Sequence, residues 1–165
     1  VSVTMIKRVV DNARVAGFNT LILQLSDAVD MGAVIPLRYN SLTTQEFRKA
    51  VNYARASGLR IIPEIKLLSH QEKFLGDKYP ELMFNKVTYD PRKEAVYELV
   101  FSYLDSVISE LQPDAIHIGH DEIWGFTKDQ RERFLGPNEA VLPADLYLKD
   151  VNRVYDYLDS RGIEV

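Results

Sequence analysis

The stretch "TTQEFRKAVNYARASGLRIIPEI", residues 43–65, contains one complete helix-to-strand unit, and it decides the fold. Thr43 and Glu46 form a T-x-x-E capping box, which marks the start of a helix. Apolar residues then recur at helical spacing and form one buried stripe: Phe47, Ala50, Val51 and Ala54. Gly58 stands where a helix C-terminal glycine belongs, and a short apolar run follows it. We therefore predict a helix that is followed at once by a strand.

The same order of elements occurs twice more along the chain, and a further helix follows at its end. The predicted elements are a helix at 4–16 closed by Gly17 and a doubly covered strand at 19–25, a helix opened by Asp90 and Pro91 with a strand at 115–118 after Pro113, and a helix at roughly 145–160 that ends at Gly162. No long low-complexity linker separates these units. Such alternation requires a parallel sheet with right-handed crossovers, either an open doubly wound sheet or a closed eight-fold barrel.

Polar residues accumulate where the predicted strands end, and this favours the barrel. Asp27 follows the first strand, Glu64, Lys66 and His70 lie at and after the end of the second, and the third runs into residues 120–122. That edge binds ligands in both architectures, but no G-x-G-x-x-G or G-x-x-x-x-G-K-[ST] motif follows any strand. We predict an α/β fold of the (β/α)8 TIM-barrel type, present as a partial barrel of about four βα units.

Residues 1–165 are predicted to form a single partial-barrel domain that is truncated at both ends. The chain starts at Val1 without a signal segment, and "RGIEV" at 161–165 stops where a new strand would begin. A half barrel leaves unpaired sheet edges and an uncovered apolar layer. We therefore expect the isolated piece to be inactive and to form a homodimer or aggregate.

The composition limits the class of partner. Hydrophobic residues make up 46% and charged residues 27% of the chain, which is typical of a globular domain with one core. The net charge of -4 and the absence of a basic cluster argue against nucleic acid, and no apolar run is long enough to cross a membrane. The chain has no cysteine, which excludes disulfides and thiolate metal sites but leaves the cellular compartment open.

Adjacent acids follow the third predicted strand, in "GHDEIW" at 119–124. Neighbours in a regular strand point to opposite faces, so Asp121 and Glu122 can share one pocket only if the backbone leaves the extended form. Gly119 would ease that turn. Two carboxylates in one pocket cannot comfortably both ionise, so we expect one of them to have a raised pKa and to act as an acid. His70 is expected to lie in the same hollow.

Three segments together resemble glycoside hydrolase family 20, the β-N-acetylhexosaminidases. "HIGHDEIW" (117–124) is similar to that family's H-x-G-G-D-E signature, and "GLRIIPEIKLLSH" (58–70) to its I-P-E-I-D-x-P-G-H strand and loop. "FNTLILQLSDAVD" (18–30) resembles the strand that ends in T-D-D. The order and spacing of the segments agree as well, so the resemblance covers roughly residues 4–124.

The resemblance implies a barrel that hydrolyses terminal N-acetylhexosamine by substrate-assisted, retaining chemistry without a cofactor. It implies that Glu122 is the general acid and base and that Asp121 orients the 2-acetamido group of a carbohydrate substrate. His70 and Asp27 would form a relay that supports Glu122.

Several positions depart from the family pattern, so the sugar and its linkage stay open. His120 replaces a small residue, Lys66 replaces an aspartate, and Ile22 and Gln24 replace histidines. We interpret three residues as substrate contacts: Glu64, His120 and Trp124. His117 is interpreted as an interior, hydrogen-bonded residue.

Two alternatives remain. The first is a metal-dependent barrel enzyme that uses residues from the set His70, His117, His120, Asp121 and Glu122. H-x-x-H on a strand directs its two imidazoles to opposite faces, so we expect no metal. The second is a non-catalytic carbohydrate-binding relative that keeps the frame of the family without its activity.

Overall fold

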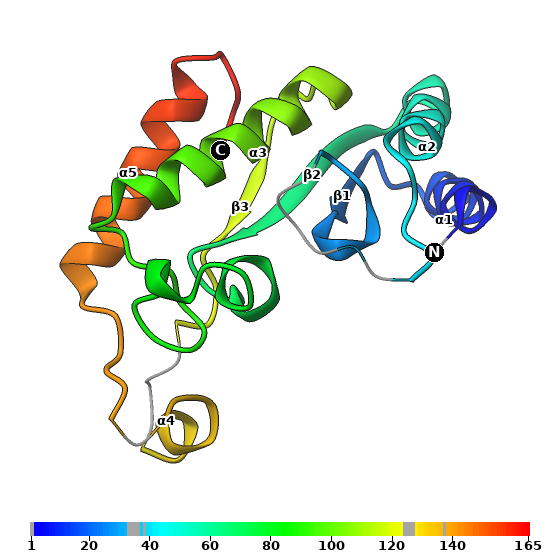
Figure 1. Cartoon of the computed structure of the whole chain (residues 1–165). Helices are drawn as coiled ribbons and strands as arrows, with labels where there is room; N and C mark the ends of the chain where they lie inside the picture. Colours follow the sequence, from blue (N-terminus) through cyan, green and yellow to red (C-terminus); the bar gives the residue numbers. More distant parts are fainter. Residues whose placement is uncertain (1, 33–36, 38, 124–127, 137) are drawn as a thin grey trace.

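A computed structural model describes residues 2–32, 37, 39–123, 128–136 and 138–165 (Figure 1). Helices and parallel strands alternate along the chain, so the predicted α/β class is confirmed. The elements, with η for a short 3-10 or π turn, are α1 (Val3–Val15), β1 (Thr20–Gln24), η1 (Ser26–Ala28), α2 (Thr44–Ala56), β2 (Arg60–Leu67), η2 (Glu72–Gly76), η3 (Pro80–Leu82), α3 (Glu94–Leu111), β3 (His117–Gly119), α4 (Lys128–Phe134) and α5 (Ala144–Asp159).

Local sequence signals set the ends of α2. The Thr43 hydroxyl accepts the Glu46 N–H at 3.2 Å, and the Glu46 carboxylate accepts the Thr43 N–H at 2.9 Å. This reciprocal pair is the predicted capping box. Gly58 follows the helix with φ +84°, a conformation that glycine adopts without steric cost.

Two helices differ from the sequence prediction. α3 begins at Glu94 rather than at Asp90 and Pro91, because the Asp90 carboxylate accepts hydrogen bonds from the backbone N–H and the guanidinium of Arg92. Asp90 therefore closes a loop instead of capping the helix. The seven-residue helix α4 was not predicted, and Figure 1 places it apart from the sheet.

The sheet is parallel throughout, in the order β1-β2-β3. Glu64 of β2 pairs with His117 of β3, and Leu67 pairs with Gly119 after an irregularity in the register. Ala115, which lies just before β3 in the chain, forms an isolated parallel bridge with Glu164, which follows α5. The described residues thus contain three strands and the first contact of a fourth, all running in one direction.

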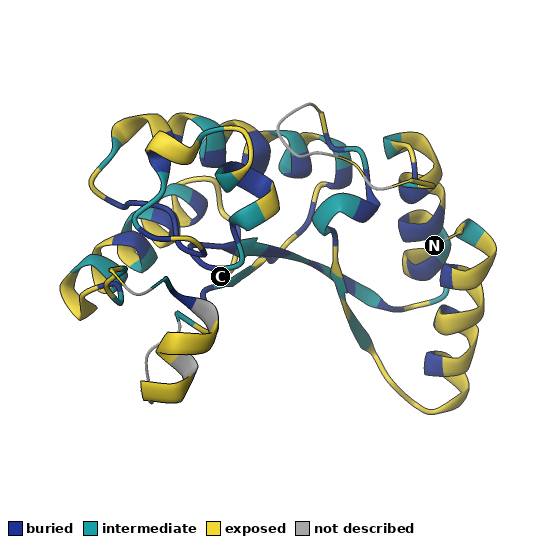
Figure 2. Cartoon of the chain, turned by 60° about the horizontal axis from the view of Figure 1, so that its bottom comes forward, coloured by how far each residue is buried: buried dark blue, intermediate teal, exposed yellow. Residues whose placement is uncertain are grey.

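The helices cover one face of the sheet and leave the other open. Along β2, buried residues alternate with half-buried ones, and Ile61, Ile65 and Leu67 join the core that α2 and α3 contribute to. In Figure 2 the ribbon of the sheet is mostly of intermediate burial. Ile22 of β1 is 53% exposed, so the prediction that both faces of this strand are covered is wrong for the described chain. Glu64 and Lys66 lie on the open face.

Within the described residues, no helix combines the length and the apolar character that crossing a bilayer would require.

Candidate active site

A tight turn at Gly119 redirects the chain as β3 ends. Gly119 has φ +77°, and a Cβ there would lie 3.0 Å from the carbonyl oxygen of Ile65 and 3.1 Å from Cα of Lys66. Only glycine fits so close to β2. His120 and Glu122 are also left-handed, with φ +63° and +49°. The predicted departure from extended backbone is confirmed.

This turn brings both neighbouring acids to His70. The His70 Nε2 atom lies 3.5 Å from Oδ2 of Asp121 and 3.4 Å from Oε2 of Glu122. The side chains of Asp121 and Glu122 are 41% and 55% exposed, so the acids open to solvent. With Glu64 and Lys66 these three residues form one group, which we call the acid cluster.

Lys66 is the cation of the acid cluster. Its Nζ donates a hydrogen bond to Oδ2 of Asp121 at 2.8 Å and lies 3.5 Å from Oε1 of Glu64. Burial acts to lower the pKa of Lys66, but the hydrogen bond and charge of Asp121, helped by Glu64, raise it overall. Lys66 is therefore held as an ammonium ion.

Asp121 is held as a carboxylate by the same contact. Burial acts to raise its pKa, but the Lys66 hydrogen bond and charge outweigh burial and lower the pKa. We expected one acid of the pair to have a raised pKa, and Asp121 is not that acid. Its other oxygen, Oδ1, is buried and has no hydrogen-bond partner in the described part of the chain.

The loop after β2 fixes His70 and Ser69. The side-chain amide of buried Gln71 donates to the carbonyl oxygens of Lys66 and Ser69, both at 2.7 Å. The Ser69 hydroxyl donates to the backbone carbonyl of Asp121. The Gln71 bonds hold the loop that carries His70, and the Ser69 bond ties this loop to the segment after β3.

The roles of Lys66, Ser69 and Gln71 were not predicted from the sequence. Lys66 gave a usable signal, because it lies two residues after Glu64 and so shares its face of the strand. Gln71 gave no such signal, since a side chain that binds nearby backbone carbonyls leaves no recognisable pattern of residue spacing in the sequence.

Asp27 lies in η1 and lines a cavity of about 310 Å³ together with His70 and Lys66. Phe74 and Tyr103 form an apolar wall of this cavity. Asp27 and His70 thus reach one hollow from the ends of two neighbouring strands.

The predicted substrate contacts separate into three groups. Glu64 lies in the acid cluster through its contact with Lys66. His120 turns away from the cluster, with its side chain 4% exposed and its Nε2 atom 2.7 Å from Oδ2 of Asp150. Trp124 lies outside the described residues.

His117 is not the interior residue that we predicted. It is exposed on the open face of the sheet, and its Nδ1 accepts the N–H of Gly119 at 3.2 Å. The predicted hydrogen bond is therefore present, but the described residues do not enclose the His117 side chain.

The structure does not bring the five predicted metal-ligand candidates together. Donor atoms of His70, Asp121 and Glu122 lie within 4.8 Å of one another and could hold a cation. The Lys66 ammonium already compensates the charge of Asp121. His117 and His120 point elsewhere. Among the described residues, only three of the five candidates therefore face a common point.

Together, the fold and the site define an α/β protein whose parallel sheet carries an acid, histidine and lysine cluster at its carboxyl edge. The chain belongs to glycosyl hydrolase family 20, whose catalytic domain matches residues 16–165. The resemblance inferred from three sequence segments is therefore confirmed.

Solved structures of β-N-acetylhexosaminidases have folds similar to that of this chain. A β-N-acetylhexosaminidase from Bacteroides fragilis NCTC 9343 aligns with a TM-score of 0.72 and 23% identity over 99% of this chain and 38% of its own. The family 20 enzyme from Streptomyces coelicolor A3(2) aligns with a TM-score of 0.76 and 19% identity over 99% of this chain and 35% of its own. At these identities the comparison shows a shared fold and says nothing further about this chain.

Among curated proteins, β-hexosaminidase A of Caenorhabditis briggsae is 25% identical over 88 residues, which cover 48% of this chain. The matched region is 16% of that relative's length, so this chain spans a small part of the proteins it resembles.

Proposed function

We propose that the protein is a glycoside hydrolase that removes terminal N-acetylhexosamine from glycans by substrate-assisted, retaining hydrolysis. The observation that carries this proposal is the approach of Asp121 and Glu122 to one imidazole, His70, at 3.5 and 3.4 Å. Membership in glycosyl hydrolase family 20 supports the substrate class.

We propose a partial (β/α)8 barrel as the frame of this site. The parallel order β1-β2-β3, the bridge from Ala115 to Glu164 and the placement of helices on one face support it. The open face that carries Glu64 and Lys66 would be the inner face of the barrel, and its carboxyl edge would bind the sugar.

Asp121 would receive the 2-acetamido group. Its Oδ2 is occupied by Lys66, whereas its buried Oδ1 has no hydrogen-bond partner among the described residues. An unpaired buried carboxylate oxygen is costly, and the amide N–H of the substrate would satisfy it. The ionised state of Asp121 also suits the positive charge that develops on the acetamido group as its oxygen attacks the anomeric carbon.

Glu122 would transfer the protons. As the acetamido oxygen bonds to the anomeric carbon and the glycosidic bond breaks, the Glu122 proton passes to the leaving oxygen. The Glu122 carboxylate then takes a proton from the water that attacks the same carbon, which restores the acetamido group with retention. His70 contacts Glu122 and would adjust the charge of the Glu122 carboxyl group as the proton moves. Asp27 lines the same cavity as His70 and would support it.

An aryl N-acetyl-β-glucosaminide tests this assignment in the full-length protein. Glu122→Gln should lower kcat by about 100- to 10,000-fold, because general acid-base catalysis contributes that much. Glu98→Gln is the matched control, since Glu98 is exposed on α3. Equal rates for the wild type and Glu122→Gln would remove Glu122 from the mechanism.

The ion pair between Lys66 and Asp121 favours a second candidate, a carbohydrate-binding relative without turnover. The ammonium ion compensates the carboxylate that the reaction would use against positive charge. Binding of N-acetylglucosamine to a protein that hydrolyses no aryl glycoside would select this candidate.

Homodimer formation stays a prediction. Ile22 is 53% exposed on the open face, and exposed apolar strands favour association. Light scattering of the purified chain tests it, and a monomer over a wide concentration range would contradict it.

A further inference from the structure

The side chain of His120 is enclosed between two acceptors. Its Nδ1 lies 3.1 Å from the carbonyl oxygen of Ile118, and its Nε2 lies 2.7 Å from Oδ2 of Asp150. A carbonyl oxygen only accepts hydrogen bonds, so Nδ1 carries a proton. The 2.7 Å contact between Nε2 and Oδ2 then requires a second proton between these atoms, and a proton on Nε2 would make the ring an imidazolium paired with the Asp150 carboxylate.

Asp150 is a fully buried acid of α5, and two tyrosine hydroxyls and the His120 ring surround it. Tyr89 donates to its Oδ2 at 2.9 Å, and Tyr97 donates to its Oδ1 at 2.7 Å. Burial, followed by the charge of Asp150, raises the pKa of both tyrosine hydroxyls, so they remain protonated donors. Donors on both oxygens, together with His120, are what a buried carboxylate requires.

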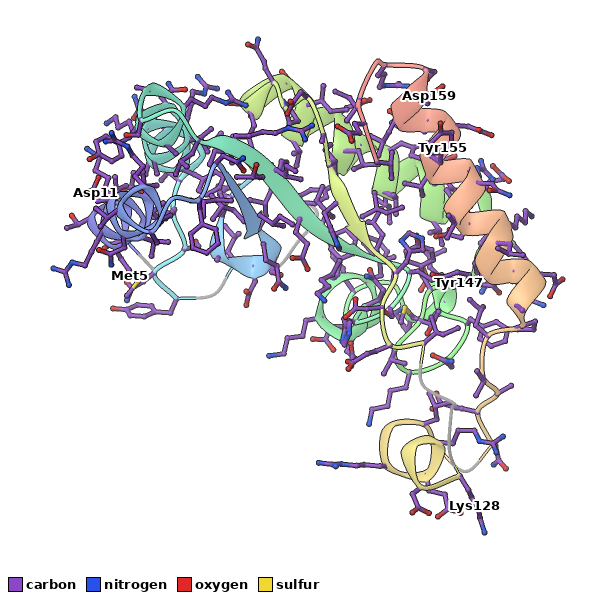
Figure 3. The ribbon with its side chains drawn as sticks, turned by 180° about the vertical axis from the view of Figure 1, so that it is seen from behind. Met5, Asp11, Lys128, Tyr147, Tyr155 and Asp159 are labelled. Carbon is purple, nitrogen blue, oxygen red and sulfur yellow. The ribbon has the colours of Figure 1, made fainter. Side chains whose placement is uncertain are left out.

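The backbone of His120 is tied to α5 as well. The Tyr147 hydroxyl donates to the His120 carbonyl at 3.3 Å, and the two rings meet edge to face with centroids 5.9 Å apart. Figure 3 shows Tyr147 near the start of α5, with Tyr155 and Asp159 further along the helix. Both the ring and the main chain of His120 are therefore held by one helix.

This attachment compensates for an unfavourable backbone. His120 has φ +63°, a left-handed conformation that side chains other than glycine rarely adopt. Asp121 and Glu122 follow directly, so the direction in which they leave β3 depends on this torsion. Without its partners, the histidine would relax towards right-handed or extended backbone.

We propose that His120, Asp150, Tyr89 and Tyr97 form a charged clamp, and that His120 is a positioning residue for the two acids. The clamp turns the chain after Gly119 and holds Asp121 and Glu122 towards His70. Helix α5, which supplies no residue to the acid cluster as described, thereby fixes the geometry of the site. The positioning role rests on the proposed hydrolase function, whereas the charge state of the clamp does not.

Nitrogen NMR of protein labelled with ¹⁵N-histidine tests the clamp without any substrate. We expect the His120 ring to show protons on both nitrogens at pH 7.5 and to lose this signature in Asp150→Asn. The chain has three histidines, so His70→Asn and His117→Asn assign the remaining signal even if a clamp variant fails to fold. A His120 ring with one proton in the wild type would overturn the charged clamp.

Kinetics test the positioning role. Asp150→Asn should lower kcat on an aryl N-acetyl-β-glucosaminide by about 100-fold, with a much smaller change in KM, because small misplacements of reacting groups cost that much. Asp156→Asn, an exposed acid on the same helix, should keep the wild-type kcat. An unchanged kcat in folded Asp150→Asn would overturn the positioning role. A full-length wild type that hydrolyses nothing would overturn the proposed function, and the nitrogen spectrum would still decide the clamp.

Discussion

The ammonium group of Lys66 donates a hydrogen bond to Oδ2 of Asp121 across 2.8 Å, between the ends of two neighbouring strands. The same contact raises the pKa of Lys66 and lowers that of Asp121. The other oxygen of Asp121, Oδ1, is buried and has no hydrogen-bond partner among the described residues. Lys66 therefore keeps Asp121 ionised and occupies one of its two oxygens. Asp121 is the acid that we assign to the acetamido group.

Replacing Lys66 by methionine should raise the pKa of Asp121, since it removes the hydrogen bond and the positive charge. The acid limb of the pH profile of kcat/KM should then move to higher pH. Lys49→Met, at an exposed position of α2, is the control. A profile of Lys66→Met that superimposes on the wild type would show that Lys66 does not tune Asp121.

Stability should fall as the pH falls, in part through Asp121. Its pKa in the folded chain lies below the unfolded value of 3.8, so it stabilises the fold above that value and loses the effect as pH drops through the folded pKa. Asp121→Asn should therefore lose less stability than the wild type between pH 7 and pH 3, as measured by urea unfolding. Equal losses would contradict the lowered pKa.

Lys66 contributes to the dependence of stability on alkaline pH. Its folded pKa lies above the unfolded value of 10.5, so its contribution is complete below that value and is lost as pH rises through the folded pKa. Lys66→Met should accordingly flatten the loss of stability in alkaline urea titrations. A curve for Lys66→Met as steep as that of the wild type would contradict this assignment.

Gly119→Ala should destabilise the chain by about 2–4 kcal/mol, because it adds the left-handed cost to a clash with the β2 backbone. The matched control is Gly17→Ala, which has φ +83° but nothing within 4 Å of the added Cβ. It should cost only the conformational part, about 1 kcal/mol. Equal changes in the free energy of unfolding would mean that the close approach to β2 carries no energy.

The sequence predicted those features that depend on neighbouring residues. The capping box of Thr43 and Glu46 set the start of α2, and Gly119 marked the turn that lets adjacent acids share a hollow. These signals work because each involves residues only a few positions apart, whose geometry the backbone itself fixes.

Features that depend on distant partners could not be predicted. His120 was interpreted as a sugar contact because it replaces a small residue in the family pattern, but it binds Asp150, 30 residues later, and is buried. Asp90 carried the signal of a helix start, yet Arg92 competes for its carboxylate. For His120 a tertiary contact decided between two locally reasonable arrangements. For Asp90 the competing partner is only two residues away, and nothing in the spacing showed which contact the carboxylate would make.

Fluorination of the substrate acetyl group tests the central claim most directly. If the acetamido oxygen is the nucleophile, kcat/KM of the full-length protein should fall steeply along the series from acetyl to mono-, di- and trifluoroacetyl aryl glucosaminide, because each fluorine withdraws electrons from that oxygen. A rate that does not change along the series would contradict a reaction in which Asp121 guides the acetamido group onto the anomeric carbon.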